Sequence, residues 1–216
     1  MRFQGRTASG VLAALSLGIG TLGCTTGDSG QEKAGESVAE RQETGDDAAQ
    51  VSGHGKPFYR AAGTGPAYWG PGDLYTFLAT GDETGNAYFQ FEALVPNGGG
   101  PPPHIHHAED ETFYLAKGSL EMHMGDEVIS AKAGDFVNIP RGTVHSFKNV
   151  GAETATMIIT FVPAGMEKYL EEVFPPAEDR TATPPPITEG LIQKMTAAAQ
   201  KHNLEFATPR QAGEGH

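Results

Sequence analysis

Four residues between positions 104 and 145 could together bind a metal ion: His104, His106, Glu111 and His145. His104 and His106 are two positions apart, and alternate residues of a β-strand point to the same face, so both imidazoles could reach one ion. Glu111 follows five positions after His106, so a bend near residues 108–110 must bring its carboxylate to the same side. His145 comes after further strand-forming segments. The four side chains would therefore meet only when a sheet closes into a barrel.

Three imidazoles and one carboxylate form a mixed set of nitrogen and oxygen donors. Such a set suits one divalent transition metal, namely iron, manganese, nickel or cobalt, with zinc and copper favoured less. It leaves coordination positions open, whereas a structural zinc site more often uses thiolates and closes its shell. The only cysteine, Cys24, lies far from these residues in the sequence. Two other histidines, His107 and His123, are expected on the outward faces of their strands.

The glycines and prolines around the four residues follow a known pattern. The stretch GGGPPPHIHHAEDETFYLAKG runs from Gly98 to Gly118, and the stretch GDFVNIPRGTVHSFKN runs from Gly134 to Asn149. Both resemble the two motifs of the cupin family, and every fixed position of each motif is present. The resemblance implies an all-β fold, the cupin double-stranded β-helix or jelly-roll barrel, with the four residues named above as metal ligands.

Alternating apolar residues separated by short Gly or Asp turns predict nine strands. We expect them near residues 73–79, 87–95, 103–107, 112–117, 119–124, 127–131, 136–139, 145–149 and 154–162. Alternation also predicts which side chains share the inner face with Glu111 and His145. The expected pocket residues are Phe113, Leu115, Met122 and Phe147.

After residue 162 the apolar residues follow the period of a helix. One apolar stripe covers residues 166–174 and ends at Pro175, and a second runs from about residue 188 to Asn203 and includes His202. We expect these C-terminal helices to cover the barrel. The expected domain boundaries are the cupin barrel at 56–165, a helical extension at 166–206 and a tail at 207–216.

Residues 1–23 have the features of a signal peptide. A positively charged start is followed by an apolar stretch that is too short to span a bilayer. Gly23 directly before Cys24 resembles a bacterial lipoprotein signal, in which the cysteine becomes the lipidated first residue of the mature chain. Residues 21 and 22 depart from that pattern, so cleavage as an ordinary secretory signal stays open. We expect an extracytoplasmic protein, either anchored to a membrane by lipid or secreted or periplasmic.

Residues 24–55 are acidic and contain only two large apolar residues, Val38 and Val51, so we expect a disordered linker. The formal net charge of the chain is -12, and removal of the two arginines in residues 1–23 makes it -14. No basic cluster is present to neutralise phosphates, so nucleic acid is not an expected partner. The only expected contact with a membrane is through the lipid.

The cupin barrel hosts many activities, so function must be argued from the site and its surroundings. Three further stretches, at residues 67–85, 163–176 and 201–206, resemble single-domain cupins related to quercetin 2,3-dioxygenase. That resemblance implies an enzyme that cleaves a flavonol, or a similar enol or phenol, with O2. It also implies that Glu111 is both a ligand and the catalytic base that takes the proton of the flavonol 3-hydroxyl.

Two alternatives stay open. An oxalate-type oxidase or decarboxylase uses the same three histidines and one glutamate, but a small dianion would call for a nearby arginine, and Arg141 is the only candidate in the motif region. The other alternative is a lipid-anchored cupin that binds a metal or a ligand without catalysis. Cupins often pair through sheet edges, so a homodimer also stays open.

Overall fold

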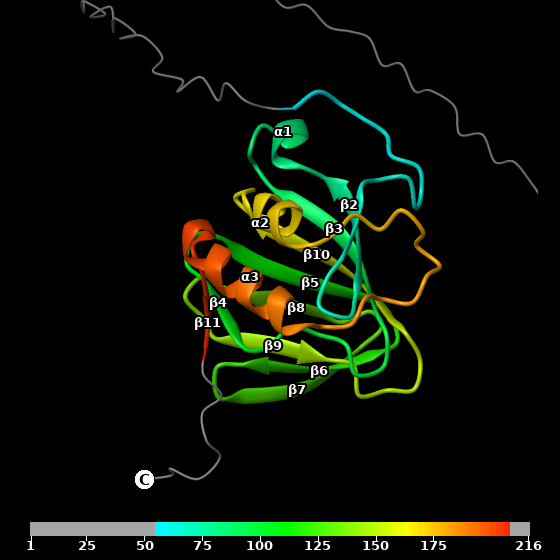
Figure 1. Ribbon diagram of the computed structural model, residues 1–216, viewed down its shortest axis with the longest axis vertical. Coiled ribbons are helices and arrows are strands. Elements are labelled where there is room, and N and C mark those ends of the chain that lie inside the picture. Colours follow the sequence, from blue (N-terminus) through cyan, green and yellow to red (C-terminus); the bar gives the residue numbers. More distant parts are fainter. Residues whose placement is uncertain (1–54, 208–216) are drawn as a thin grey trace, which may run out of the picture. The chain divides into compact units, whose positions relative to one another are not determined.

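The computed structural model describes residues 55–207. The expected signal peptide, the lipidated Cys24 and all but the last residue of the acidic linker lie outside the described residues, as does the tail from 208. The described chain forms two antiparallel β-sheets and a C-terminal pair of helices (Figure 1). Within this part of the chain, no helix has the length and apolar character needed to cross a bilayer.

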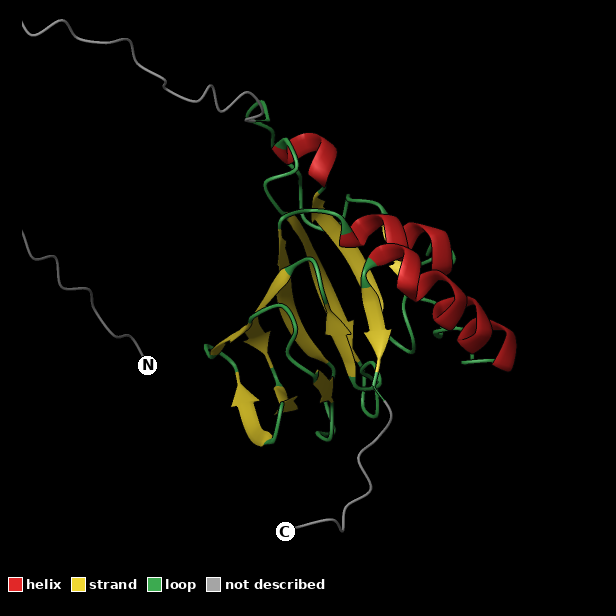
Figure 2. Ribbon diagram, turned by 90° about the vertical axis from the view of Figure 1, so that its left-hand side faces the viewer, coloured by secondary structure: helices red, strands yellow, loops and turns green. Residues whose placement is uncertain are grey.

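Each sheet combines strands that are distant in the sequence. In spatial order, the six-stranded sheet contains β1 (Ala67–Trp69), β2 (Leu74–Ala79), β3 (Phe89–Val95), β10 (Ala155–Val162), β5 (Asp110–Lys117) and β8 (Phe136–Ile139). The five-stranded sheet contains β11 (Leu204–Phe206), β4 (His104–His106), β9 (His145–Lys148), β6 (Ser119–Met124) and β7 (Glu127–Lys132). Figure 2 shows the two sheets facing each other, which is the arrangement expected of a double-stranded β-helix.

The inner face of the six-stranded sheet is mostly apolar, and burial alternates along β3, β8 and β10. Every second residue of β3 is buried, in agreement with the period of two. Phe77, Phe89, Phe91 and Phe161 are at most 3% exposed, and the rings of Phe77 and Phe89 lie 4.7 Å apart in an edge-to-face arrangement. This aromatic cluster forms a rigid apolar wall inside the barrel.

The helices α2 (Met166–Val173) and α3 (Glu189–Ala199) pack on each other on one side of the barrel (Figures 1 and 2). The Tyr169 hydroxyl of α2 donates to the carbonyl of Met195 in α3, at 3.3 Å. A 3-10 turn, η1 (Gln200–His202), leads from α3 into β11, which pairs with β4. We call the segment from α2 to β11 the cap.

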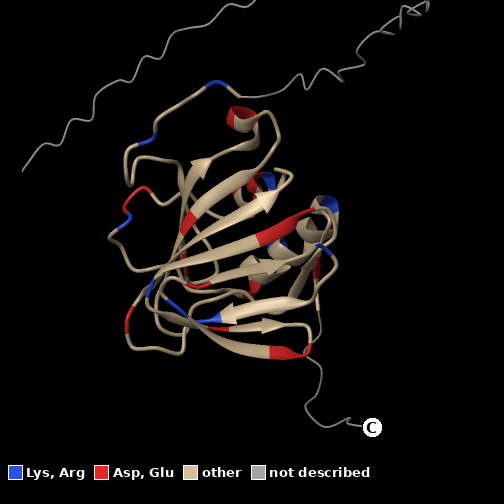
Figure 3. Ribbon diagram, turned by 180° about the vertical axis from the view of Figure 1, so that it is seen from behind, with Lys and Arg blue, Asp and Glu red and all other residues tan. Residues whose placement is uncertain are grey.

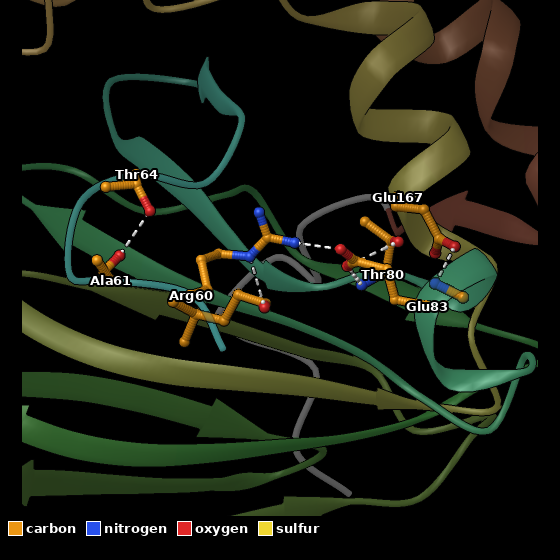
Figure 4. Close-up of polar contacts among 8 residues, drawn as sticks. Arg60, Ala61, Thr64, Thr80, Glu83 and Glu167 are labelled. Carbon is orange, nitrogen blue, oxygen red and sulfur yellow. Dashed lines mark hydrogen bonds and ion pairs between the residues drawn. The ribbon is translucent and has the colours of Figure 1, made fainter. Parts of the chain in front are cut away.

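The start of the cap is fixed to the rest of the barrel by a buried carboxylate. Glu167 is 2% exposed and accepts hydrogen bonds from the N–H groups of Gly81 (3.0 Å) and Gly165 (2.8 Å). Gly81 begins the short helix α1 (Gly81–Thr84), where Glu83 pairs with Arg60 (Figure 4). A Cβ atom at position 81 would lie 2.6 Å from Oε1 of Glu167 and 2.8 Å from Cβ of Ala164, so a larger residue there would displace the Glu167 carboxylate. This network holds the beginning of α2 in place.

All nine expected strands are present, and Asn203 ends the helical region in a left-handed conformation as expected. The structure also contains three elements that the sequence patterns did not predict: α1, β1 and β11. They contain three or four residues each, which is too short to establish a period. The bend expected near residues 108–110 is a passage of residues 107–109 from β4 in one sheet to β5 in the other.

Candidate metal centre

The structure brings His104, His106, Glu111 and His145 together inside the barrel. One ligand atom from each residue lies within 4.8 Å of those of the other three, and all four residues are buried. His104 and His145 are direct partners across the β4–β9 pair, whereas Glu111 comes from β5 in the opposite sheet. The two sheets must therefore face each other before the cluster exists.

Backbone carbonyls orient two of the three imidazoles. The Nδ1 atom of His104 lies 2.9 Å from the carbonyl oxygen of Pro102, and Nδ1 of His145 lies 3.1 Å from that of Thr143. A carbonyl can only accept, so both Nδ1 atoms carry a proton, and Nε2 is the atom of each of these two rings that can bind a metal. The Oε2 atom of Glu111 is 2.7 Å from Nε2 of His145 and 3.4 Å from Nε2 of His106. The ligand atoms thus converge on one point.

The electrostatics of the cluster favour a neutral imidazole at His104 and an ionised carboxylate at Glu111. Burial, reinforced by the neighbouring His145 and His106, lowers the pKa of His104 to about 3, so its imidazole is neutral at pH 7. Burial would raise the pKa of Glu111, but the adjacent His145 and His106 bring it below its ordinary value. Burial opposes protonation of His145, yet the Glu111 carboxylate raises the pKa of this imidazole. The contact therefore favours a proton between Nε2 of His145 and the Glu111 carboxylate. A divalent cation bound here would displace this proton and balance the negative charge of the carboxylate.

The residues present fit a divalent transition metal. Both ring nitrogens of His106 are buried without a hydrogen-bond partner among the described residues. Buried polar atoms of this kind normally have a partner, and an ion bound by Nε2 would provide one. The donor set of three nitrogens and one carboxylate suits such a metal and leaves positions open for a ligand.

A cavity of about 60 Å³ lies next to His104, His106 and Glu111. The remaining lining residues are apolar or aromatic. From the barrel they are Pro71, Tyr75, Phe91, Pro101, Phe147, Ile159 and Phe161, and from the cap and its connection they are Met166, Tyr169, Leu170, Phe174, Met195, Leu204 and Phe206. None of these described lining residues is Lys, Arg or Asp, so the only charged groups at the cavity belong to the cluster itself.

The expected pocket residues occupy two different environments. Phe147 lines the cavity. Phe113, Leu115 and Met122 are buried in the core but do not line it, although the ring of Phe113 lies 6.2 Å from that of His145. Strand alternation finds the inner face of a sheet, but it does not show which inner side chains pack against the opposite sheet.

The sequence patterns did not identify the cap side chains, Tyr75 or Glu109 as parts of the site. Glu109 is 5% exposed, its Oε2 atom has no partner among the described residues, and burial raises its pKa. Glu109 lies in the passage between β4 and β5, where strand alternation gives no prediction. His107 and His123 point away from the cluster, as expected, and are paired with Glu205 and Glu121.

Comparison with known proteins agrees with this architecture. Residues 91–161 match the family model of the cupin domain, and the barrel around the cluster is a cupin fold. The chain is 27% identical over 146 residues to quercetin 2,3-dioxygenase of Bacillus subtilis, which covers 66% of this chain and 42% of that protein. It is 29% identical over 102 residues to the polyketide synthase CurC of Streptomyces cyaneus, covering 47% of this chain and 66% of that protein.

Among solved structures, this chain is similar to KdgF from Halomonas sp. The similarity covers 52% of this chain and 98% of the KdgF chain, with 18% sequence identity and a TM-score of 0.46. The chain spans less than two thirds of the length of either curated relative described above.

Proposed function

We propose that this chain is a metal-dependent cupin oxygenase that cleaves a flavonol, or a similar enol or phenol, with O2. The observation that carries the proposal is the buried cluster of three histidines and Glu111 beside a cavity whose other walls are apolar and aromatic. The similarity to quercetin 2,3-dioxygenase of Bacillus subtilis supports the substrate class.

The cavity suits an aromatic ligand that carries a single ionisable oxygen. The rings of Phe91 and Phe161 lie 6.2 Å apart, and the ring of His106 lies 4.9 Å from that of Phe161, so apolar surface continues up to the ligand atoms. A flat aromatic molecule would bury its rings against this surface and direct its hydroxyl to the cluster. The same walls would exclude water from the anion that forms when the hydroxyl loses its proton.

Glu111 is the residue placed to accept that proton. It is 4% exposed, is ionised in its present surroundings, and directs Oε2 toward the point on which the three imidazoles converge. A bound divalent metal would supply Lewis acidity that lowers the pKa of a hydroxyl placed at an open position. The carboxylate would then hold the proton while the substrate is present as the electron-rich anion.

The surroundings of Arg141 disfavour an oxalate-type activity. Its guanidinium forms a two-point interaction with Asp110, with Nε 3.0 Å from Oδ1 and Nη2 3.1 Å from Oδ2. The side chain is 48% exposed and does not line the cavity. Charged residues of both signs are interspersed over the described chain (Figure 3), and none of the cations lies at the cavity wall. A small dianion would therefore find no counter-charge besides the metal.

The cavity is too small to hold a flavonol unless part of its wall moves. At about 60 Å³ it is several-fold smaller than the roughly 300–1,000 Å³ of pockets for drug-sized ligands. The cap contributes seven of the seventeen lining residues, and β11 is an edge strand of three residues. We therefore propose that a flavonol reaches the cluster when the part of the cap that follows α2 moves outward.

The test uses protein loaded separately with Fe, Mn, Ni and Co. Without oxygen, quercetin should bind and shift its absorption to longer wavelength, because the deprotonated 3-oxide extends conjugation. On admission of oxygen, O2 uptake should be accompanied by release of carbon monoxide. Glu111→Gln should still bind quercetin but turn over roughly 10²- to 10⁴-fold more slowly, as is typical for loss of a general base. Glu121→Gln, which changes a carboxylate on the outer face, serves as the matched control and should behave as the wild type.

A spectral shift without oxygen consumption for every metal would contradict the oxygenase proposal. The chain would then be a binding protein that captures its ligand through the same cluster.

A further inference from the structure

One buried polar pair in the cavity wall is not used by the metal cluster. Tyr75 on β2 lines the cavity and is 5% exposed. Its hydroxyl donates to Oδ2 of Asp73 at 3.3 Å, and Asp73 is 0% exposed. The other carboxyl oxygen, Oδ1, has no partner with hydrogen-bond geometry among the described residues, although the backbone N–H of Gly100 interacts with the carboxyl group and lowers its pKa. A fully buried carboxyl group with a free oxygen destabilises a fold, so this arrangement calls for a functional reason.

Glycines on two sides make room for this pair. A Cβ atom at Gly99 would lie 2.3 Å from Oδ1 of Asp73, and a Cβ atom at Gly70 would lie 2.3 Å from the ring of Tyr75. The ring of Tyr75 also packs against Phe91, with centroids 4.9 Å apart. Close packing therefore holds both side chains in place, and a small rotation would not bring the Asp73 carboxyl group to solvent.

Tyr75 differs from the other phenol of the wall. The Tyr169 hydroxyl donates to the carbonyl of Met195 and so joins the two cap helices. Among the described lining residues outside the cluster, these two tyrosines are the only ones with a polar side-chain group. Among the described lining residues, Tyr75 is thus the one whose hydroxyl is hydrogen-bonded to a carboxyl group.

The acid can exist in either protonation state near neutral pH, and each state directs the tyrosine differently. Burial raises the pKa of Asp73 to about 7, and burial together with the charges of Asp73, Glu111 and Tyr169 raises the pKa of Tyr75 well above its ordinary value. An ionised Asp73 accepts the phenolic O–H. A protonated Asp73 can donate its own O–H to the phenolic oxygen, which frees the phenolic hydrogen to point into the cavity. A buried acid kept neutral in this way can support a hydrogen bond to an anionic oxygen.

We propose that Tyr75, supported by Asp73, is a positioning residue that donates a hydrogen bond to an oxygen atom of the ligand bound beside the metal cluster. The inference rests on the proposed function in one respect, that the cavity accepts an oxygen-bearing ligand. It adds a second point of attachment, on β2, to the attachment at the cluster.

The experiment is an anaerobic titration of metal-loaded protein with two ligands, quercetin and acetohydroxamate, followed by absorbance. Acetohydroxamate is small enough to test the cluster without a large movement of the cap. Tyr75→Phe keeps the ring and removes the hydroxyl, so Kd should rise about tenfold, as expected for loss of a hydrogen bond to a charged oxygen. Tyr114→Phe also removes one phenolic hydroxyl, but from a side chain that is 49% exposed and does not line the cavity, so it is the matched control and its Kd should stay close to that of the wild type. Metal content should be equal in all variants.

Asp73→Asn supplies a second readout that a purely structural role would not move. The asparagine Nδ2–H donates to the phenolic oxygen at every pH, so this variant imitates the protonated acid. From about pH 6 to about pH 8, the affinity of the wild type should fall relative to that of Asp73→Asn as Asp73 ionises.

The outcomes separate the two proposals. Unchanged affinity of Tyr75→Phe for a ligand that the wild type binds would overturn the role of Tyr75 and leave the oxygenase proposal intact. Failure of the wild type to bind quercetin while it binds acetohydroxamate would overturn the flavonol assignment, and the acetohydroxamate titrations would still decide the role of Tyr75. If the wild type binds neither ligand, both proposals are wrong.

Discussion

Replacement of Asp73 by asparagine should stabilise the fold at alkaline pH and leave its stability at acidic pH nearly unchanged. The carboxyl group is fully buried and accepts one long hydrogen bond from Tyr75, and no group among the described residues has hydrogen-bond geometry to Oδ1. The hydroxyl of Tyr75 and the backbone N–H of Gly100 offset only part of the burial that raises the pKa of Asp73. Asparagine has almost the same shape and can never carry a negative charge. The substitution therefore removes the cost of ionisation and keeps the packing against Gly99.

The magnitude follows from the pKa of this group. Burial moves the pKa of Asp73 from 3.8 to about 7, and each pKa unit corresponds to ~1.4 kcal/mol. The folded chain therefore binds this proton more tightly than the unfolded chain does. The contribution of Asp73 to stability is fully present below about pH 4, is lost as pH rises to about 7, and is level above that. Above pH 7 the wild type should be less stable than Asp73→Asn by up to ~4 kcal/mol, and at pH 4 the two should agree.

The assay is urea unfolding of both proteins at several pH values, with metal removed from both by a chelator. The difference in the free energy of unfolding between the two proteins isolates Asp73, because all other titrating groups are shared. Asp82→Asn, with a side chain that is 84% exposed, is the control and should show no such pH-dependent difference. Parallel pH profiles of the wild type and Asp73→Asn would refute the reasoning.

Three other predictions concern the metal, the cap and the N-terminus. His145→Ala should lose most of its divalent metal while keeping a β-rich circular dichroism spectrum, since this residue supplies the imidazole closest to Glu111; metal analysis that finds full occupancy would contradict the site. Ligand binding should slow amide hydrogen exchange in α3 and β11, because the cap supplies much of the cavity wall; unchanged exchange there would argue against a moving cap. Cys24→Ser should abolish labelling by radioactive fatty acid and release the protein from membranes, and a wild-type chain that is unlabelled and soluble would exclude the lipoprotein proposal.

The strands and the candidate ligands could be predicted because their signals are local. His104 and His106 share a face through the strand period alone, and the glycines near them mark turns whether or not the rest of the chain is known. The inner position of Phe113 followed from the same rule. The rule could not distinguish Phe147, which lines the cavity, from Phe113, which is buried but does not line it. That distinction depends on the distance to the opposite sheet.

Residue spacing alone therefore predicts the barrel, the residue types of the cluster and the apolar stripes of the cap helices. The closure of the cavity depends on contacts that exist only in the folded chain. Leu204 and Phe206 line it because β11 pairs with β4, opposite His106 and His104, across nearly one hundred positions of sequence. Likewise, Asp73 and Tyr75 are two positions apart, so the sequence predicts that they share a strand face. Their close packing in the folded chain depends on Gly70 and Gly99, which approach them from separate loops. Local periodicity fixes the direction of a side chain, whereas its partners and its loss of solvent depend on segments that meet only in the folded chain.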